Sequence, residues 1–207
     1  MDHNQISVNT FNKLAQVYQD KYMDLPLYHL TYDALCARMS AYDKVLDIGC
    51  GPGNISRYLL DRVADIDLLG TDLAPNMIEL ARLNNPEAHF EVMDCRAVAD
   101  LDQQFDVIVC GFCFPYLNKE EVKSMISAMS SRLTDTGVLY LSTMEGDYSA
   151  SCMQTSSSGD NAFIYYHDGD ELTQQLDDNG LTLVWSHRQD YPERGDVDLF
   201  LIAKKGA

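Results

Sequence analysis

The sequence is poor in positive charge. Its 207 residues include only 15 Lys and Arg against 32 Asp and Glu, which gives a formal net charge of −17 at pH 7. Nucleic acids and anionic membranes are bound largely by Lys and Arg side chains that neutralise phosphates, and the longest basic cluster here is Lys204-Lys205. The composition therefore argues against a nucleic-acid or membrane partner and favours a neutral or cationic small-molecule ligand.

Long hydrophobic runs and targeting segments are absent as well. The apolar run 105–117 is too short to span a bilayer and contains Pro115. The opening MDHNQISVNT has neither the basic nor the apolar region of a signal peptide. These features predict a cytoplasmic protein, and the chain length fits one domain, as a monomer or a homodimer.

The six cysteines form no recognisable framework, and without a signal peptide they are expected to be reduced thiols. Cys110 and Cys113 have the C-x-x-C spacing of a redox pair or half a zinc site. No second pair and no paired histidines follow at zinc-site spacing. We therefore expect no metal and interpret both residues as packing residues, with a regulatory thiol pair as the alternative.

Residues 1–42 predict two amphipathic helices, because apolar side chains recur at three- and four-residue steps on either side of Pro26. This segment holds five of the twelve tyrosines. It either packs on the core or forms an aromatic lid over a ligand, and we predict a lid that is part of the same domain as residues 43–207.

After residue 42, short apolar runs alternate with helical patterns. This alternation predicts an open α/β sheet with right-handed crossovers. The last two runs, joined by the short turn 191–195, predict an antiparallel hairpin, and the polar segment 149–160 is interpreted as a mobile loop. The expected strands are 44–48, 67–72, 89–94, 105–111, 138–143, 181–187 and 197–203, and the expected helices between them are 54–63, 75–83, 118–133 and 168–179.

The strongest local signal is VLDIGCGPGN at residues 45–54, in which a strand ends at glycines and a helix begins directly after them. Glycines let the backbone approach a ligand closely, since no Cβ intervenes. The dinucleotide fingerprint G-x-G-x-x-G competes with this interpretation. Here the third glycine, Gly53, stands at the wrong offset, and Pro52 removes an amide donor that a pyrophosphate would need. A nicotinamide oxidoreductase is therefore disfavoured.

This segment resembles the first motif of class I S-adenosylmethionine-dependent methyltransferases. The resemblance covers most of residues 41–143 and continues through GTDLAPNMI at 70–78, EVMDC at 91–95, FDVIVC at 105–110 and LTDTGVLY at 133–140. The opening FNKLAQVY at 11–18 resembles the N-terminal helix common in enzymes that methylate small molecules. The resemblance implies a Rossmann-like, three-layer αβα fold with a seven-stranded, mostly parallel sheet and an antiparallel last strand.

The resemblance also implies residue roles for binding S-adenosylmethionine, and S-adenosylhomocysteine as product. Asp72 would accept hydrogen bonds from the ribose hydroxyls, and Asp94 would accept one from the adenine amino group. The Cys110 carbonyl would accept a hydrogen bond from the cofactor ammonium, and the charge of Asp47 would also favour that ammonium. The other implied contacts are Gly49, Cys50, Gly51 and Gly53 beside the methionine part, Leu73 and Met77 on the adenine faces, the Cys95 backbone N–H on an adenine nitrogen, and Tyr18 and Tyr22 over the methionine end.

The acceptor site is less legible in the sequence. By analogy, it is formed by the N-terminal helices together with 113–117, 144–167 and 191–195. His167 is the candidate catalytic base, since imidazole titrates near neutral pH, and His29 is a second candidate; both could equally be packing or surface residues. We predict methyl transfer to a hydroxyl or amine of a small molecule. A non-catalytic protein that binds S-adenosylmethionine or S-adenosylhomocysteine is the alternative from a different class.

Overall fold

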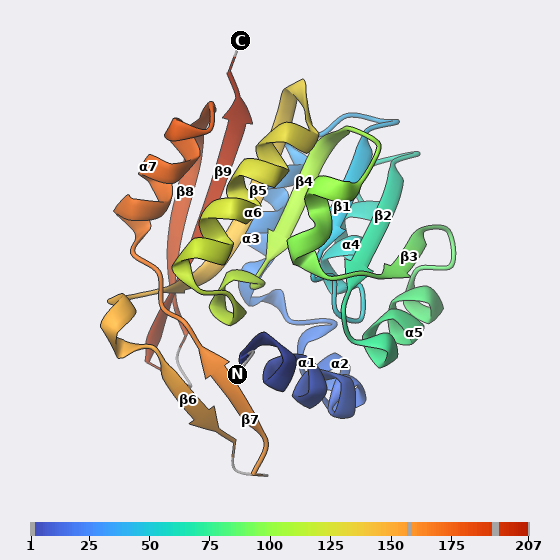
Figure 1. The fold of residues 1–207 in the computed structure, drawn as a ribbon. Coiled ribbons are helices and arrows are strands. Elements are labelled where there is room, and N and C mark those ends of the chain that lie inside the picture. Colours follow the sequence, from blue (N-terminus) through green and yellow to red (C-terminus); the bar gives the residue numbers. More distant parts are fainter. Residues whose placement is uncertain (1–2, 157–158, 192–194, 207) are drawn as a thin grey trace.

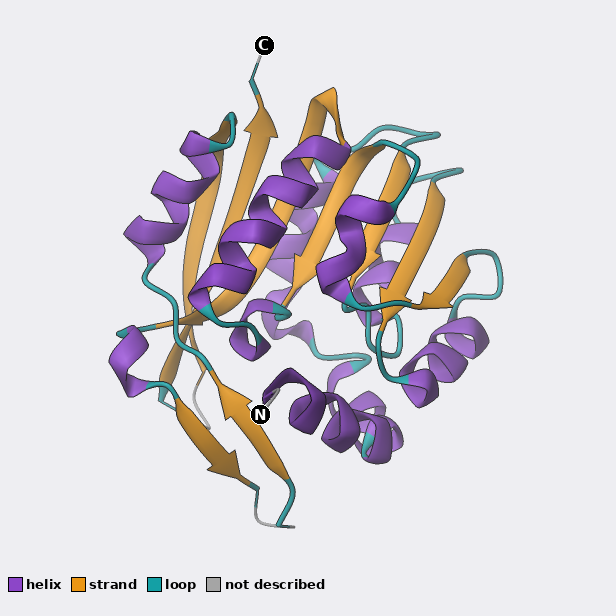
Figure 2. Ribbon diagram, in the orientation of Figure 1, coloured by secondary structure: helices purple, strands orange, loops and turns teal. Residues whose placement is uncertain are grey.

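The computed structural model describes residues 3–156, 159–191 and 195–206, which form a three-layer α/β/α sandwich (Figures 1 and 2). The central sheet has the strand order β3-β2-β1-β4-β5-β9-β8. Its strands are β1 (Lys44–Ile48), β2 (Asp67–Asp72), β3 (His89–Val92), β4 (Phe105–Gly111), β5 (Leu133–Glu145), β8 (Leu181–Tyr191) and β9 (Asp196–Lys205). The α-helices are α1 (His3–Lys13), α2 (Ala15–Tyr22), α3 (His29–Cys36), α4 (Asn54–Leu60), α5 (Pro75–Asn84), α6 (Lys119–Arg132) and α7 (Gly169–Asp178).

The sheet confirms the fold predicted from the alternating pattern. Strands β1 to β5 pair in parallel, whereas β9 runs antiparallel to both of its neighbours, β5 and β8. The strand order reverses between β1 and β4, where Ile48 lies opposite Cys110. Such a reversal leaves a crevice outside the carboxyl ends of the two strands, which is where open α/β sheets bind ligands.

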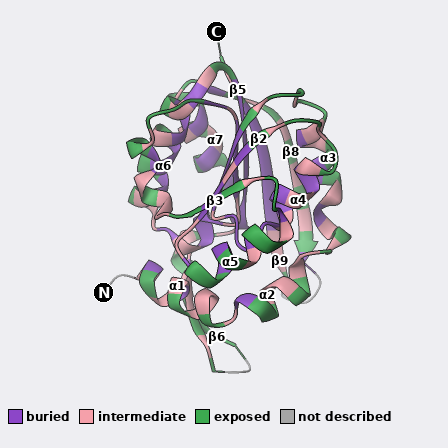
Figure 3. Ribbon diagram, turned by 90° about the vertical axis from the view of Figure 1, so that its right-hand side faces the viewer, coloured by how far each residue is buried: buried purple, intermediate pink, exposed green. Residues whose placement is uncertain are grey.

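Helices cover both faces of the sheet and bury two apolar cores (Figure 3). Helices α6 and α7 pack on one face, and α3, α4 and α5 pack on the other. Helix α6 begins at a capping box, in which the Asn118 side chain accepts from the Glu121 amide and the Glu121 side chain accepts from the Asn118 amide. Within the described ranges, no helix is long and apolar enough to cross a membrane.

The N-terminal segment is helical as expected, but it is divided differently. Helix α1 begins at His3, eight residues before the first position of the apolar repeat, and ends at Lys13. Helix α2 begins at Ala15, so Leu14 interrupts the single helix that the repeat had predicted. A short 3₁₀ turn, Pro26–Tyr28, precedes α3. Figure 1 shows α1 and α2 lying below the carboxyl ends of the parallel strands.

Half of the segment 149–160, predicted as a loop, is regular secondary structure instead. A 3₁₀ turn, Tyr148–Ala150, leads into β6 (Cys152–Thr155), which pairs antiparallel with β7 (Asn161–Ile164). This hairpin stands apart from the main sheet and packs beside α1 (Figure 1). Residues 157–158, and residues 192–194 of the turn predicted between the last two strands, lie outside the described residues.

Candidate active site

Two adjacent cavities lie between the carboxyl ends of the strands and the N-terminal helices. Their empty volumes are about 730 and 740 Å³. The first extends under α1 and α5, and the second extends toward α3 and β5. The two cavities share a wall formed by Tyr18, Gly49, Gly51, Gly111, Phe112 and Tyr116.

The glycine loop after β1 adopts a backbone that only glycine readily supplies. Gly49, Gly51 and Gly53 have φ values of 66°, 55° and 79°, in the left-handed region where a Cβ is strained. A Cβ on Gly53 would also collide with the Asn85 amide, which is buried and donates to the Gly53 carbonyl. Gly49 and Gly51 therefore line both cavities with backbone alone, and neither has a side chain to fill the space beside it.

Asp72 lies at the carboxyl end of β2 and lines the first cavity, as the sequence predicted for a ligand-binding carboxylate. Its Oδ2 accepts from the Gly51 amide at 3.0 Å, and its Oδ1 accepts from the Ala74 amide at 2.8 Å. Burial raises the pKa of this carboxyl, and the backbone hydrogen bonds oppose that rise. Each carboxylate oxygen has two lone pairs, so both can accept a further hydrogen bond from a ligand.

The first cavity has apolar walls beside Asp72. Leu73, Met77 and Cys95 line it as the sequence predicted, and Met93 joins them. Asp94 does not line it, because its carboxylate is turned to Arg96, whose Nη2 donates to Oδ2 at 2.7 Å. Burial favours a higher pKa for Asp94, but the hydrogen bonds from Arg96 outweigh it and lower the pKa.

Asp47 lies beneath the glycine loop and lines neither cavity. It is 1% exposed, and its Oδ2 accepts from the Ser56 hydroxyl at 2.7 Å, while its Oδ1 has no hydrogen-bond partner. Burial raises its pKa to about 7, with the hydrogen bond from Ser56 opposing and the charge of Asp72 adding to the rise. Any influence of this carboxyl on a ligand ammonium must act through the loop.

The remaining predicted cofactor contacts are divided between the two cavities. Tyr18 lines both, and Tyr22 and Cys50 line only the second. The Tyr18 and Tyr22 rings lie 4.5 Å apart between centroids. The Cys110 side chain is fully buried and lines neither cavity, although the next residue, Gly111, lines both.

The structure places the two candidate bases away from the cavities. His167 is buried, and its Nε2 donates to the Phe114 carbonyl at 2.9 Å. Burial lowers its pKa, with the bond to Phe114 opposing. The His29 ring packs against the Tyr58 ring at an interplanar angle of 48°, with centroids 4.7 Å apart. Neither histidine lines either cavity, so the geometry gives no support to a role for either as general base.

Sequence reasoning placed the N-terminal helices at the site but did not identify the residues of α1 that line it. Asn4, Ser7, Val8 and Phe11 line the first cavity from a single helical stripe. These four residues are spaced as on one face of a helix, but two of them are polar. The apolar pattern used to predict the first helix therefore begins only at Phe11. The region after β4 was expected at the acceptor site, and Phe112, Cys113 and Tyr116 do line the cavities.

Comparison with known proteins agrees with this geometry. Residues 45–137 match the protein family described as Methyltransferase domain. Malonyl-[acyl-carrier protein] O-methyltransferase of Acetivibrio thermocellus is 34% identical over 101 residues, covering 48% of this chain and 35% of that protein. The chain spans 32% to 45% of the length of the first curated relatives that it matches.

Solved structures share the whole fold. The 1,6-didemethyltoxoflavin-N1-methyltransferase of Burkholderia thailandensis has a TM-score of 0.74 at 21% identity, covering 100% of this chain and 91% of its own. Magnesium protoporphyrin IX methyltransferase of Synechocystis has a TM-score of 0.74 at 19% identity, covering 100% and 98%. Residues 45–137 are thus matched by a methyltransferase-domain family, and the strand order and the glycine loop agree with that match.

Proposed function

We propose that this protein transfers the methyl group of S-adenosylmethionine to a hydroxyl or amine of a small molecule. The observation that carries the proposal is the pair of adjoining cavities at the point where the strand order reverses. One cavity offers a carboxylate and apolar walls, and six of the fifteen residues that line the other are aromatic. Their shared wall at Gly49 and Gly51 is where a bound cofactor and an acceptor would meet.

The residues of the first cavity fit S-adenosylmethionine. Asp72 offers carboxylate oxygens to the ribose hydroxyls, and Leu73 and Met77 offer apolar surface to the adenine. Gly49 and Gly51 line this cavity without a side chain and have positive φ values of 66° and 55°, so the loop leaves room for the methionine part. Bound there, S-adenosylmethionine would supply a methyl group activated by a positively charged sulfur. Asp94, Cys95 and the Cys110 carbonyl remain proposed contacts of the same cofactor.

The protein's own contribution to the reaction is positioning. Tyr18 and Tyr116 belong to the wall shared by both cavities, so they limit the water that reaches it. None of the fifteen residues that line the second cavity, all within the described part of the chain, is His, Asp, Glu or Lys. We therefore propose catalysis by alignment, which can contribute about 7–11 kcal/mol by itself.

The names of similar proteins support a small-molecule acceptor, since one acts on 1,6-didemethyltoxoflavin and another on magnesium protoporphyrin IX. Calorimetry with S-adenosylhomocysteine, and with NAD as the matched control, tests the cofactor half of the proposal. We expect a 1:1 complex with S-adenosylhomocysteine and no heat with NAD. Tight NAD binding without S-adenosylhomocysteine binding would overturn the assignment. Binding without methyl transfer to any acceptor would instead favour a non-catalytic binding protein.

A further inference from the structure

The wall of the second cavity is rich in aromatic rings. Six of its fifteen lining residues carry one, and they come from α2, from α3 with the turn before it, and from the segment after β4. Leu25, Ile55 and Met144 add aliphatic surface between them. The six aromatic residues are Tyr18, Tyr22, Tyr28, Tyr32, Phe112 and Tyr116.

Contacts outside the cavity hold several of these rings in place. The Tyr28 hydroxyl donates to Oδ2 of the buried Asp198 at 2.7 Å, and the Tyr28 ring lies 5.3 Å from the Phe112 ring between centroids. The Tyr32 ring meets the Tyr58 ring edge-on at 5.1 Å. Tyr28 and Tyr32 are only 7% and 5% exposed, so each lines the cavity with a small part of its ring, which is held in place without an ordering cost when a ligand arrives. Flat apolar faces favour offset or edge-to-face contact with another aromatic ring.

The charges around this cavity disfavour an anionic ligand. None of its fifteen lining residues is Lys, Arg or His. Three carboxylates stand behind its wall: Asp72 accepts from the Gly51 amide, Asp198 accepts from the Tyr28 hydroxyl, and Asp47 lies close enough to act electrostatically on the Tyr32 phenol. The Lys21 ammonium lies 5.3 Å from the centroid of the Tyr22 ring but does not line the cavity. A carboxylate or phosphate entering the cavity would lose its water without meeting a cationic side chain among the lining residues, which is costly.

We infer that the second cavity is the acceptor site and that it selects a planar aromatic molecule without a carboxylate or phosphate group. This inference rests on the proposed function, because it places the acceptor next to the cofactor cavity across the shared wall. It adds to that function the chemical class of the acceptor. Selection comes from ring contacts with the tyrosines and from the cost of desolvating an anion.

Naphthol and naphthoate test the inference, because they share one ring system and differ in the anionic group. Binding of each to the protein saturated with S-adenosylhomocysteine is followed by fluorescence anisotropy, and the saturated analogue decalol is tested by displacement of naphthol. We expect naphthol to bind and naphthoate and decalol to bind at least about tenfold more weakly, a difference of about 1.4 kcal/mol. Equal binding of naphthoate, or no binding of naphthol, would overturn the inference.

Placing a cation in the cavity should reverse the preference. Leu25 lines the second cavity, so Leu25→Lys should strengthen naphthoate binding at least about tenfold. Leu30→Lys is the matched control, because Leu30 is 61% exposed and lines neither cavity. An unchanged naphthoate affinity in Leu25→Lys, or an equal gain in Leu30→Lys, would show that the probe binds elsewhere and would overturn the assignment of this cavity.

The same samples separate this inference from the proposed function. Calorimetry of each variant with S-adenosylhomocysteine reports the fold and the cofactor site independently of naphthol. Failure of S-adenosylhomocysteine to bind the parent protein contradicts the proposed function itself. Normal S-adenosylhomocysteine binding that displaces naphthol would show that the second cavity belongs to the cofactor site, and only the inference about the acceptor would then fall.

Discussion

Asp72 combines two tasks in one side chain. Its carboxylate ties the glycine loop to the start of α5 through the Gly51 and Ala74 amides, and it faces the first cavity with lone pairs to spare. A hydrogen bond to a charged group is worth about 1.5–3 kcal/mol. Loss of this carboxylate should therefore weaken the ligand contact and loosen the loop together.

We expect Asp72→Ala to weaken S-adenosylhomocysteine binding at least about tenfold, since each lost charged hydrogen bond contributes about 1.5–3 kcal/mol. Calorimetry measures the affinity. The control is Asp67→Ala, because Asp67 is exposed at the opposite end of the same strand. An affinity of Asp72→Ala that stays within about twofold of the parent, a difference below about 0.4 kcal/mol, would remove Asp72 from the ribose site.

Asp47 is a buried carboxyl whose ionisation the fold opposes. Its pKa of about 7 lies above the ordinary aspartate value of 3.8, chiefly because of burial. A raised pKa in the folded state means that the folded protein holds the proton more tightly than the unfolded chain does. The free energy of unfolding contains this contribution fully below the unfolded pKa and loses it as the pH rises through about 7.

Replacing Asp47 with Asn should remove this pH dependence. Asn stays neutral and can still accept from the Ser56 hydroxyl through its amide oxygen. Between about pH 5.5 and about pH 8.5, we expect the parent to lose about 2 kcal/mol of unfolding free energy relative to Asp47→Asn, by integration of proton linkage. Urea unfolding at the two pH values measures the difference. Parallel pH profiles for the two proteins would show that Asp47 ionises normally in the fold.

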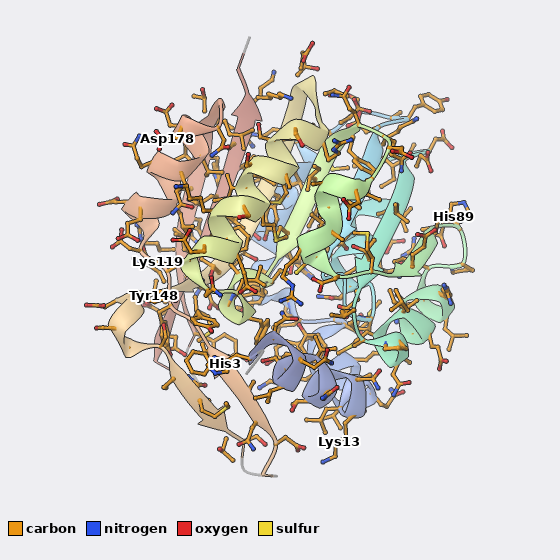
Figure 4. The ribbon with its side chains drawn as sticks, viewed as in Figure 1. His3, Lys13, His89, Lys119, Tyr148 and Asp178 are labelled. Atoms are coloured by element: carbon orange, nitrogen blue, oxygen red, sulfur yellow. The ribbon has the colours of Figure 1, made fainter. Side chains whose placement is uncertain are left out.

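At the scale of the element, α1 is held from outside the sheet by the β6–β7 hairpin. The His3 ring stacks on Phe163 with centroids 4.2 Å apart, and the Thr10 hydroxyl donates to the Asn161 carbonyl at 2.7 Å. Lys13 forms an ion pair with Asp160 at 2.6 Å. Figure 4 shows His3 beside the hairpin and Lys13 near the far end of α1. The helix and the hairpin therefore form one cover for the first cavity.

This cover should respond to the cofactor as a unit. Helix α1 lines the first cavity with Asn4, Ser7, Val8 and Phe11, so a ligand there adds contacts to the helix. We expect S-adenosylhomocysteine to slow amide hydrogen exchange in α1 and α2, and in β7 through its contacts with α1. Strand β9, buried inside the sheet, is the internal reference. Slowing confined to the glycine loop, with α1 and β7 unchanged, would leave these helices a purely structural role.

At the scale of the whole molecule, the sheet was predictable because its central strands are short apolar runs. The run 105–111 reappears as β4, the middle strand of the sheet. The β6–β7 hairpin was missed because all four residues of β6 are exposed, so neither alternation nor an apolar run marks it. The hairpin packs against α1, which lies about 150 residues earlier in the sequence. A contact between segments so far apart cannot be predicted from the local sequence pattern.

Some residues of the candidate site could likewise be placed from the sequence, and others could not. The positions of Gly49, Gly51 and Asp72 follow from strand ends, and a strand end can be located from local sequence. The position of His167 depends on the path of the chain after β5, which returns it beneath Phe114 rather than into a cavity. Residue type alone suggested a base there, and three-dimensional packing decided otherwise.

The charge of the whole chain limits which acceptors can approach the site. A net charge of −17 repels polyanions at long range, and no Lys or Arg is found among the described residues that line either cavity. We therefore expect methyl transfer to small molecules that carry a hydroxyl or amine, and none to tRNA, DNA or anionic lipid vesicles. An assay that measures S-adenosylhomocysteine release over a panel of these acceptors, each at low and at high salt, checks the expectation.

The salt series is the control for tRNA. Low salt strengthens contacts between protein cations and phosphates, so tRNA binding would be strongest there. Turnover on tRNA at low salt that high salt abolishes would show that a basic surface outweighs the net charge, and the exclusion would then be wrong.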